Sequence, residues 1–298
     1  MRTNRLLGIG LIALGAAIAT AALLGPLVLN VLSYRTSPTT LNQIVGSDAA
    51  ALIVVAPVSV LIGLLALRGH RAAPVLALAP AIFAVYTYTQ LIVGNEYLRL
   101  PGNVERFFPL LLGVFVLAGG ITVVAWSVVE LGALPPASRR TDRTAGVVLM
   151  VIAAFVVFGL HLPSYIDAMR IHPTTVAYVS SPTPFWLVKL MDLGIVVPVA
   201  IAVGVGMLRR RASARKPMYA LIGGYTLLGA SVAGMAITMY LNDDPDASVA
   251  TLVSSTGMAL VLAVLAGYVY RPLLRRRTDE EPGPGHPQRM TVHTVPVR

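Results

Sequence analysis

Long apolar segments alternate with short polar connections along almost the whole chain. A helix crosses the hydrocarbon core of a bilayer, which is about 30 Å thick, with about 20 apolar residues. Eight segments reach this length, and we expect them to be the spans of an all-α, polytopic transmembrane helix bundle. They cover residues 6–32, 49–67, 72–94, 108–131, 146–165, 185–208, 218–241 and 248–270.

Basic residues fall mainly in alternate connections, and this predicts the orientation of the spans. Cytoplasmic loops hold an excess of Lys and Arg, whereas acidic residues contribute little to orientation. We therefore expect both termini in the cytoplasm, as an even number of spans requires. The connections on that side contain Arg2, Arg5, Arg68, Arg71, Arg139, Arg140, Arg143, Arg209, Arg210, Arg211, Arg215, Lys216, Arg271, Arg275, Arg276 and Arg277.

Composition agrees with a membrane protein and excludes several other classes. Hydrophobic residues make up 56% of the chain and charged residues only 12%, which sets a soluble domain aside. The net charge of +10 comes from loop ends without interleaved aromatic residues, so we expect no nucleic-acid partner. The absence of cysteine excludes disulfides, thiolate catalysis and cysteine metal sites. Arginine far outnumbers lysine, which indicates a GC-rich genome, and we expect the bacterial inner (plasma) membrane as the location.

Both ends of the chain need an interpretation. Arg2 and Arg5 precede an apolar run with small residues at 17–22, a pattern that also fits a cleaved signal peptide. Because the run continues to residue 32, we expect an uncleaved anchor. Residues 278–298 lack apolar periodicity and are rich in Pro and Gly, so we expect a disordered cytoplasmic tail after a bundle that covers 1–277.

A short internal similarity suggests two repeats. Residues 53–58 read Ile-Val-Val-Ala-Pro-Val and residues 195–199 read Ile-Val-Val-Pro-Val, and a basic loop follows each of them. An acidic residue precedes each proline, and four spans separate the copies. We therefore expect two parallel four-helix repeats, residues 1–135 and 144–272, related by an axis along the membrane normal.

Polar side chains inside the spans are the candidates for a functional site, because they usually face the bundle interior or a water-filled cavity. The candidate cavity, ion-binding or substrate-binding residues are Tyr86, Gln90, Glu96, His161, Lys189 and Asp192. Tyr86 and Gln90 share one helix face because they are four residues apart. Hydrogen bonding between helices is the other common use of such residues, and this alternative stays open.

Lys189 and Asp192 form the most specific pair. Their i, i+3 spacing allows a salt bridge. In one interpretation, Lys189 snorkels toward the membrane surface beside Trp186 while Asp192 pairs with it or caps a neighbouring helix. In the other, Asp192 accepts a proton or a cation in an outward-facing cavity. Pro198 favours the second interpretation, since it frees the backbone carbonyl of Gly194 one turn earlier.

Further residues are expected to have structural roles. Asp48 follows Gly and Ser at the start of an apolar run, and we expect it to be the N-cap of the second span. The acidic turn at 242–246 is expected to cap the eighth span. The structural motif of the two repeats consists of Asp48, Pro57, Gly194 and Pro198.

Signatures of catalysis and of cofactor binding are missing from the sequence. His70, His161 and His172 have no partner at metal-ligand spacing, so we expect no metal site. A dinucleotide-binding glycine pattern, a phosphate-binding loop and a nucleophile elbow are also absent. We therefore expect no cofactor and name no catalytic residue.

Three motifs resemble a known group of proteins. They are Gly-Ser-Asp (46–48) with its downstream proline, Gly-Asn-Glu-Tyr (94–97) after an aromatic and polar helix, and Leu-Met-Asp-Leu-Gly-Ile-Val-Val-Pro (190–198). Together they look like a group of bacterial polytopic membrane proteins without an assigned activity. The resemblance covers roughly residues 44–125 and 185–240, and it implies that Asp192, Gly194 and Pro198 act together.

Two functions of different classes remain, with a third behind them. The first is a secondary transporter or ion-coupled permease with an outward-facing polar cavity. The alternative is a non-transporting membrane protein that assembles with, senses or stabilises envelope components. The third, an intramembrane enzyme acting on lipid or quinone, lacks an identifiable acid, base and metal. The lipid bilayer is the expected partner, and other membrane proteins or a second copy of the chain are the further ones.

The alternation of basic connections predicts a topology that reporter fusions can test. Fusions after Arg71, Arg143, Arg215 and Arg277 should all report a cytoplasmic location, because each follows a basic connection. Alkaline phosphatase, active only outside the cytoplasm, and a fluorescent protein, active only inside, provide opposite readouts. A periplasmic signal at any of the four positions contradicts the topology.

Overall fold

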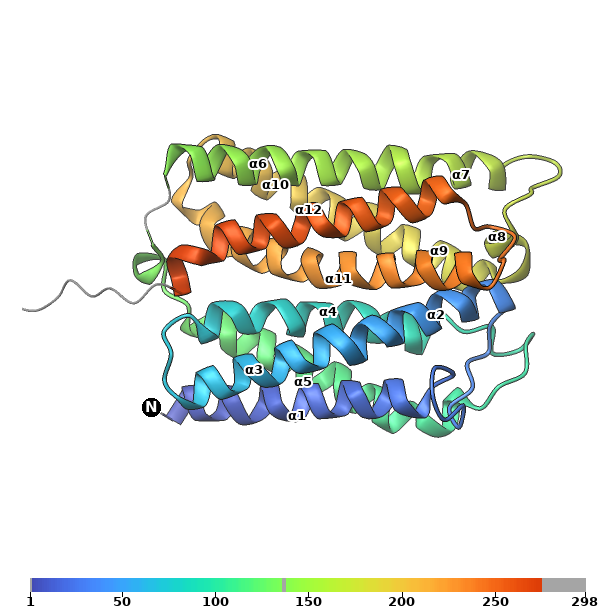
Figure 1. Cartoon of the computed structure of the whole chain (residues 1–298), viewed down its shortest axis with the longest axis horizontal. Helices are drawn as coiled ribbons and strands as arrows, with labels where there is room; N and C mark the ends of the chain where they lie inside the picture. Colours follow the sequence, from blue (N-terminus) through green and yellow to red (C-terminus); the bar gives the residue numbers. More distant parts are fainter. Residues whose placement is uncertain (1, 136–137, 275–298) are drawn as a thin grey trace, which may run out of the picture.

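The computed structural model describes residues 2–135 and 138–274, and these residues form helices and connections without a strand. Eight helical segments are long and apolar enough to cross a membrane, which confirms the predicted fold class. They run back and forth along one direction, so that the connections gather at two ends (Figure 1). The protein is therefore an integral, multi-pass membrane protein in contact with the lipid bilayer.

Helices of the first half come first along the chain. Five of them build four spans, since α2 and α3 belong to one span. They are α1 (Arg2–Leu24), α2 (Pro38–Ala50), α3 (Ala56–Leu67), α4 (Ala73–Val93) and α5 (Phe108–Val128). Short 3₁₀ segments, η2 (Val104–Phe107) and η3 (Leu131–Ala133), lie on either side of α5.

Helices of the second half again build four spans, two of which consist of two α-helices each. The helices are α6 (Arg139–Ala154), α7 (Leu162–Ala168), α8 (Val176–Ser180), α9 (Pro182–Met191), α10 (Val197–Leu208), α11 (Arg215–Leu241) and α12 (Val249–Leu274), with a 3₁₀ segment, η6 (Ala212–Ala214), before α11. The short α8 lies in a connection and spans nothing.

Three spans contain a π-helical segment that joins their two α-helices. These segments are η1 (Ala51–Val55), η4 (Phe155–His161) and η5 (Asp192–Val196). A proline stands two residues after the end of each one: Pro57, Pro163 and Pro198. In a regular helix the proline ring meets the carbonyl four residues earlier, and the wider π turn moves that carbonyl away. Pro80 and Pro272 lie in α4 and α12 without a π segment, so proline alone does not cause the change.

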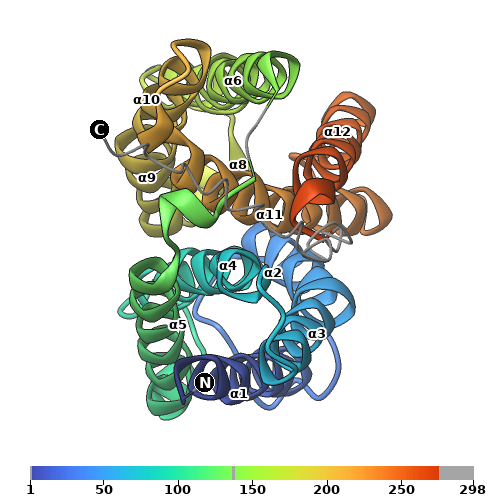
Figure 2. The same ribbon diagram turned by 90° about the vertical axis from the view of Figure 1, so that its left-hand side faces the viewer.

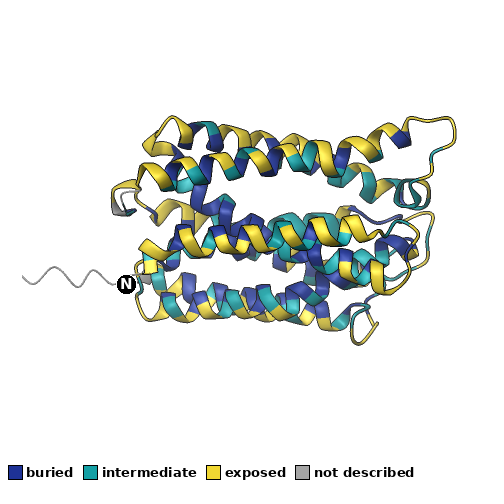
Figure 3. Ribbon diagram, turned by 45° about the horizontal axis from the view of Figure 1, so that its top comes forward, coloured by how far each residue is buried: buried dark blue, intermediate teal, exposed yellow. Residues whose placement is uncertain are grey.

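Two hydrophobic clusters form the core, one mainly in each half, and each also includes residues of the other half. Leu11, Phe83 and Leu111 belong to the first cluster, and Leu149, Met207 and Ile222 to the second. Seen along the helices, α1 to α5 form one group and α6 to α12 the other, with α11 at the boundary (Figure 2). There α11 packs against α2 and α4 of the first half as well as against α12. Exposed positions face outward (Figure 3), and α5 and α12 have the lowest buried shares, so they are largely lipid-facing.

The closest approach of the two halves is a contact between backbones. A Cβ added to Gly46 of α2 would collide with the carbonyl group of Gly234 of α11, and the reverse also holds. One turn away, the hydroxyl of Ser231 donates a hydrogen bond to Ser47 Oγ at 2.8 Å. Small residues of this kind let membrane helices pack closely.

Polar links also join the halves at the end opposite the basic connections. The backbone N–H of Ser37 donates to Ser181 Oγ at 3.0 Å. The backbone N–H of Thr183 donates to the Glu96 carboxylate at 2.7 Å, and Asn42 Nδ2 donates to Asp244 Oδ2 at 2.8 Å. At the basic end the half-buried Lys216 of α11 donates to the carbonyl of Trp126 and lies over its ring.

Several expected helix ends were wrong. The first helix ends at Leu24, eight residues before the apolar run ends, because Gly25 and Pro26 follow it. The second span begins at Pro38 with Ser37 as its N-cap, whose Oγ accepts from the N–H of Thr40. Asp48 is therefore an interior residue of α2 and not a cap.

The acidic turn was also assigned the wrong role. Ser248 Oγ accepts a hydrogen bond from the N–H of Thr251 at the start of α12, while Asp246 accepts from Val176 and Ala177 at the start of α8. The proposed disordered tail, residues 278–298, lies outside the described residues.

Substituting Gly46 by alanine should destabilise the protein, because its methyl group collides with α11 backbone that cannot move aside as a side chain could. We expect the melting temperature in detergent to fall by several degrees, with the same direction for Gly234→Ala. Gly257→Ala is the matched control, because open space surrounds that glycine and alanine favours a helix by about 1 kcal/mol. Equal behaviour of Gly46→Ala and Gly257→Ala contradicts the close backbone contact.

Candidate functional site

A cavity of about 110 Å³ lies mainly among helices of the second half, between α6, α11 and α12 and the π segments η4 and η5, and α4 of the first half contributes Tyr86 to its lining. Its walls are apolar and include Ile152, Phe155, Leu160, Val232, Met258 and Leu262. Four residues with polar side chains also line it: Tyr86, Asp192, Tyr225 and Ser255. A space of this size holds several water molecules or part of a larger ligand.

Asp192 is the charged residue among those that line the cavity, and two side chains from other spans bind it. The hydroxyl of Tyr86 on α4 donates to Asp192 Oδ1 at 2.5 Å. His161 Nε2 lies 2.7 Å from Asp192 Oδ2. We call Tyr86, His161 and Asp192 the Asp192 cluster. Its carboxylate faces protein rather than lipid, as the cost of an isolated charge in a bilayer requires.

Local backbone geometry positions the cluster. His161 is the last residue of η4 and Asp192 the first residue of η5, so both members of this pair stand at the edge of a π turn. Such turns often occur at functional sites. The carbonyl of Val196, at the other end of η5, accepts a hydrogen bond from the Tyr225 hydroxyl at 2.9 Å. Gly194 and Pro198 lie on the exposed side of this segment and do not line the cavity.

The expected salt bridge between Lys189 and Asp192 was wrong. Lys189 Nζ donates to Ser164 Oγ at 2.8 Å and lies 3.7 Å from the centre of the Phe185 ring. Lys189 is buried among protein side chains. The salt bridge does not form because both carboxylate oxygens of Asp192 are already bonded to groups on neighbouring spans.

The remaining candidates lie apart from the cavity. Glu96 is buried near the end of the bundle, where it accepts from the backbone of Thr183 and pairs with Arg99 at 3.5 Å. Gln90 follows Tyr86 by one turn of α4 but does not line the cavity. The structure therefore brings together Tyr86, His161 and Asp192. Glu96 lies apart from these three residues, and Lys189 donates its hydrogen bond to Ser164 instead of to Asp192.

Sequence reasoning missed Tyr225 and Ser255. Both lie in apolar helices without a neighbouring charge, so no local pattern marks them. Pro163 was also missed, although its position two residues after His161 repeats the pattern around Pro198.

The cluster joins a carboxylate, an imidazole and a phenol through hydrogen bonds. The phenol of Tyr86 donates to Asp192, and the imidazole of His161 can do so through an Nε2–H. Within residues 2–135 and 138–274, no three His, Asp or Glu side chains are grouped as a metal site would require.

These features define the class: a polytopic membrane protein with a polar cluster buried at an intramembrane cavity. Comparison with family models, with curated proteins and with solved structures finds no match, so no family is identified.

A double-mutant cycle can test the bond between Tyr86 and Asp192. Tyr86→Phe should lower the melting temperature, since a hydrogen bond to a charged group contributes about 1.5–3 kcal/mol. The same change in an Asp192→Asn background should have a smaller effect, because the charge is gone. Tyr240→Phe is a matched control at an exposed position. Strictly additive effects would contradict the contact.

Proposed function

We propose that the protein is a proton-coupled secondary transporter for a lipophilic cation, with its substrate site in the cavity beside the Asp192 cluster. The observation that carries the proposal is the placement of one carboxylate at the polar side of an otherwise apolar cavity. Such a carboxylate can hold either a proton or the charge of a substrate, and this competition is the simplest form of coupled exchange.

The walls of the cavity support a lipophilic substrate. They consist mainly of aliphatic and aromatic side chains, which favour an apolar body over a hydrated one. The helices α6 and α12 both line the cavity but touch each other at few points, whereas α1 and α5 of the first half pack together. This arrangement favours entry from the hydrocarbon core between α6 and α12.

The position of the cluster also fits a transporter. Asp192 lies ten residues after Pro182, the first residue of α9, which corresponds to about 15 Å along the helix and to the middle of a bilayer. Tyr86 belongs to the first half and Asp192 to the second. Transporters built from repeats bind their substrates near the midplane, at the interface between the repeats.

The two proposed repeats, residues 1–135 and 144–272, have comparable elements. In each, the second span contains a π segment, η1 or η5, followed by a proline. In each, the last two spans pack against one another, α4 with α5 and α11 with α12. With the basic connections placed in the cytoplasm, the polar links between the halves face outward, and we propose this orientation for a bacterial inner membrane.

The proposal predicts uptake of tetraphenylphosphonium into proteoliposomes whose interior is more acidic than the outside. Outward proton flow through Asp192 should drive accumulation. Asp192→Asn should reduce this accumulation by at least about 90%. Such a tenfold reduction in rate requires the loss of an interaction worth only about 1.4 kcal/mol. Asp243→Asn, at an exposed turn, is the matched control and should transport normally.

The other hypotheses predict different outcomes. Binding of tetraphenylphosphonium without accumulation supports the non-transporting alternative, a sensor or stabiliser of envelope components. Chemical conversion of an added lipid or quinone supports the intramembrane enzyme. Absence of both binding and uptake of the cation contradicts the proposal.

A further inference from the structure

Asp48 is a second acidic residue inside the bundle, and it is not part of the proposed transport site. Asp48 lies in the interior of α2, with 6% of its surface exposed. Its Oδ2 accepts no hydrogen bond from any residue that the structure describes, and no described Lys, Arg or His forms an ion pair with it. A buried carboxylate in a bilayer keeps its charge only beside a positive partner.

The carboxylate of Asp48 faces the C-terminal end of α1. Its Oδ2 lies 2.8 Å from the point that a Cβ on Gly25 would occupy, and the carbonyl oxygen of Ala22 lies 3.4 Å from the same point. In a continuing helix the carbonyl of Ala22 would accept from residue 26, but Pro26 has no N–H. No described backbone N–H of the following turn replaces it.

The electrostatics of this place favour a cation. The C-terminal end of a helix carries about half a negative charge, and the carboxyl group of Asp48, which adds a full negative charge when ionised, is directed at it. With Asp48 ionised, two negative groups therefore converge on one small space bounded by Gly25. The repulsion is relieved when a positive charge lies between them, an arrangement that transporters use to bind Na⁺ at the ends of broken helices.

Tyr34 carries a further buried oxygen, near enough to Asp48 for the two groups to interact electrostatically. Its hydroxyl has no hydrogen-bond partner among the described residues. Burial, and after it the charge of Asp48, raise the pKa of Tyr34, so its hydroxyl stays neutral.

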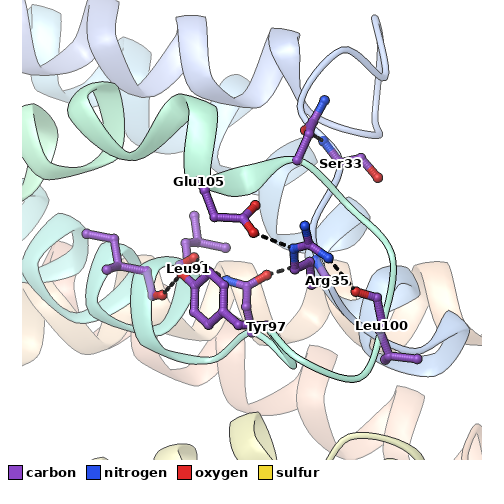
Figure 4. A network of polar contacts seen from close by, with 9 residues as sticks. Ser33, Arg35, Leu91, Tyr97, Leu100 and Glu105 are labelled. Atoms are coloured by element: carbon purple, nitrogen blue, oxygen red, sulfur yellow. Dashed lines mark hydrogen bonds and ion pairs between the residues drawn. The ribbon is translucent and has the colours of Figure 1, made fainter.

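The loop that contains Tyr34 is rigidly held. The backbone N–H of Ser33 donates to Asn103 Oδ1 at 2.8 Å, and that of Arg35 donates to Asn95 Oδ1 at 2.9 Å. Arg35 also pairs with Glu105 at 2.6 Å and donates to the carbonyl of Leu100 (Figure 4). The charge of Arg35 is therefore directed to Glu105, not to Asp48.

We propose that Asp48, the carbonyl of Ala22 and the hydroxyl of Tyr34 bind one sodium ion. All three contribute oxygen, the ligand that hard cations prefer, and a single carboxylate matches a single positive charge. A divalent ion would leave an excess charge in the same apolar surroundings. The site lies in the first half, is separate from the Asp192 cluster, and does not depend on the proposed transport.

Thermal unfolding of the purified full-length protein tests the site without a transport measurement. We compare chloride salts of sodium, potassium and N-methylglucamine at an ionic strength of about 0.15 M. A ligand that binds only the folded state raises its melting temperature, and we expect sodium to raise it by about 3–5 °C over N-methylglucamine.

Two variants locate the effect. Asp48→Asn should abolish the sodium response yet fold in sodium-free buffer, because the amide is uncharged and can donate to the carbonyl of Ala22. Gly25→Ala should also abolish the response, since its methyl group occupies the space between the oxygens. Gly113→Ala is the matched control, because open space surrounds that glycine, and Asp192→Asn should retain the response.

Three outcomes overturn the sodium site. Equal melting temperatures in all three salts mean that Asp48 is instead protonated and bonded within the protein. A sodium response that survives both Asp48→Asn and Gly25→Ala places the ion elsewhere. A response that is lost only in Asp192→Asn assigns sodium to the cavity of the second half.

Discussion

The lack of water in the hydrocarbon core is the constraint on which this structure depends, because every backbone N–H and C=O must find its partner inside the protein. Proline breaks that rule locally, since it removes a donor and displaces a carbonyl. The chain meets the problem in three of its spans with a wider turn before Pro57, Pro163 and Pro198. At Pro26 it ends the helix instead and leaves the carbonyl of Ala22 without its usual donor.

Three ionisable residues inside the spans lie close to these interruptions. His161 and Asp192 stand at the edges of two π segments, and Asp48 lies three residues before the third. A continuous helix satisfies its own polar groups and has little need of a charged neighbour. An interrupted one offers carbonyls and a wider turn, so charge can be accommodated there. At these three places, the interrupted helix and the ionisable side chain therefore accommodate each other.

The sequence predicted the number and order of the spans because apolar length is a property of consecutive residues. Helix ends were less predictable. Residues 38–48 are too polar to be recognised as part of an apolar run, yet they form most of α2. They are helical because they pack on α11, as the contacts of Gly46 and Ser47 show. Conversely, α1 stops inside its apolar run at Gly25 and Pro26.

Some members of the candidate site were predictable, but their bonds were not. Asp192, His161 and Tyr86 were identified because polar residues in apolar spans are few. The pairing of Lys189 with Asp192 was wrong because spacing along one helix carries no information about partners on other helices. Tyr225 and Ser255 face the cavity only through the packing of α11 and α12, which no local pattern reveals.

Three polar links join the halves at the outer end of the bundle, through Ser37, Glu96 and Asn42, whereas the half-buried Lys216 makes the link at the basic end. Between the ends, the halves meet at the backbone contact of Gly46 with Gly234 and through two side-chain hydrogen bonds, Ser231 to Ser47 and Tyr86 to Asp192. A relative tilt of the halves therefore strains the bond that holds Asp192, so a movement of one half against the other and a change at the Asp192 cluster are mechanically coupled.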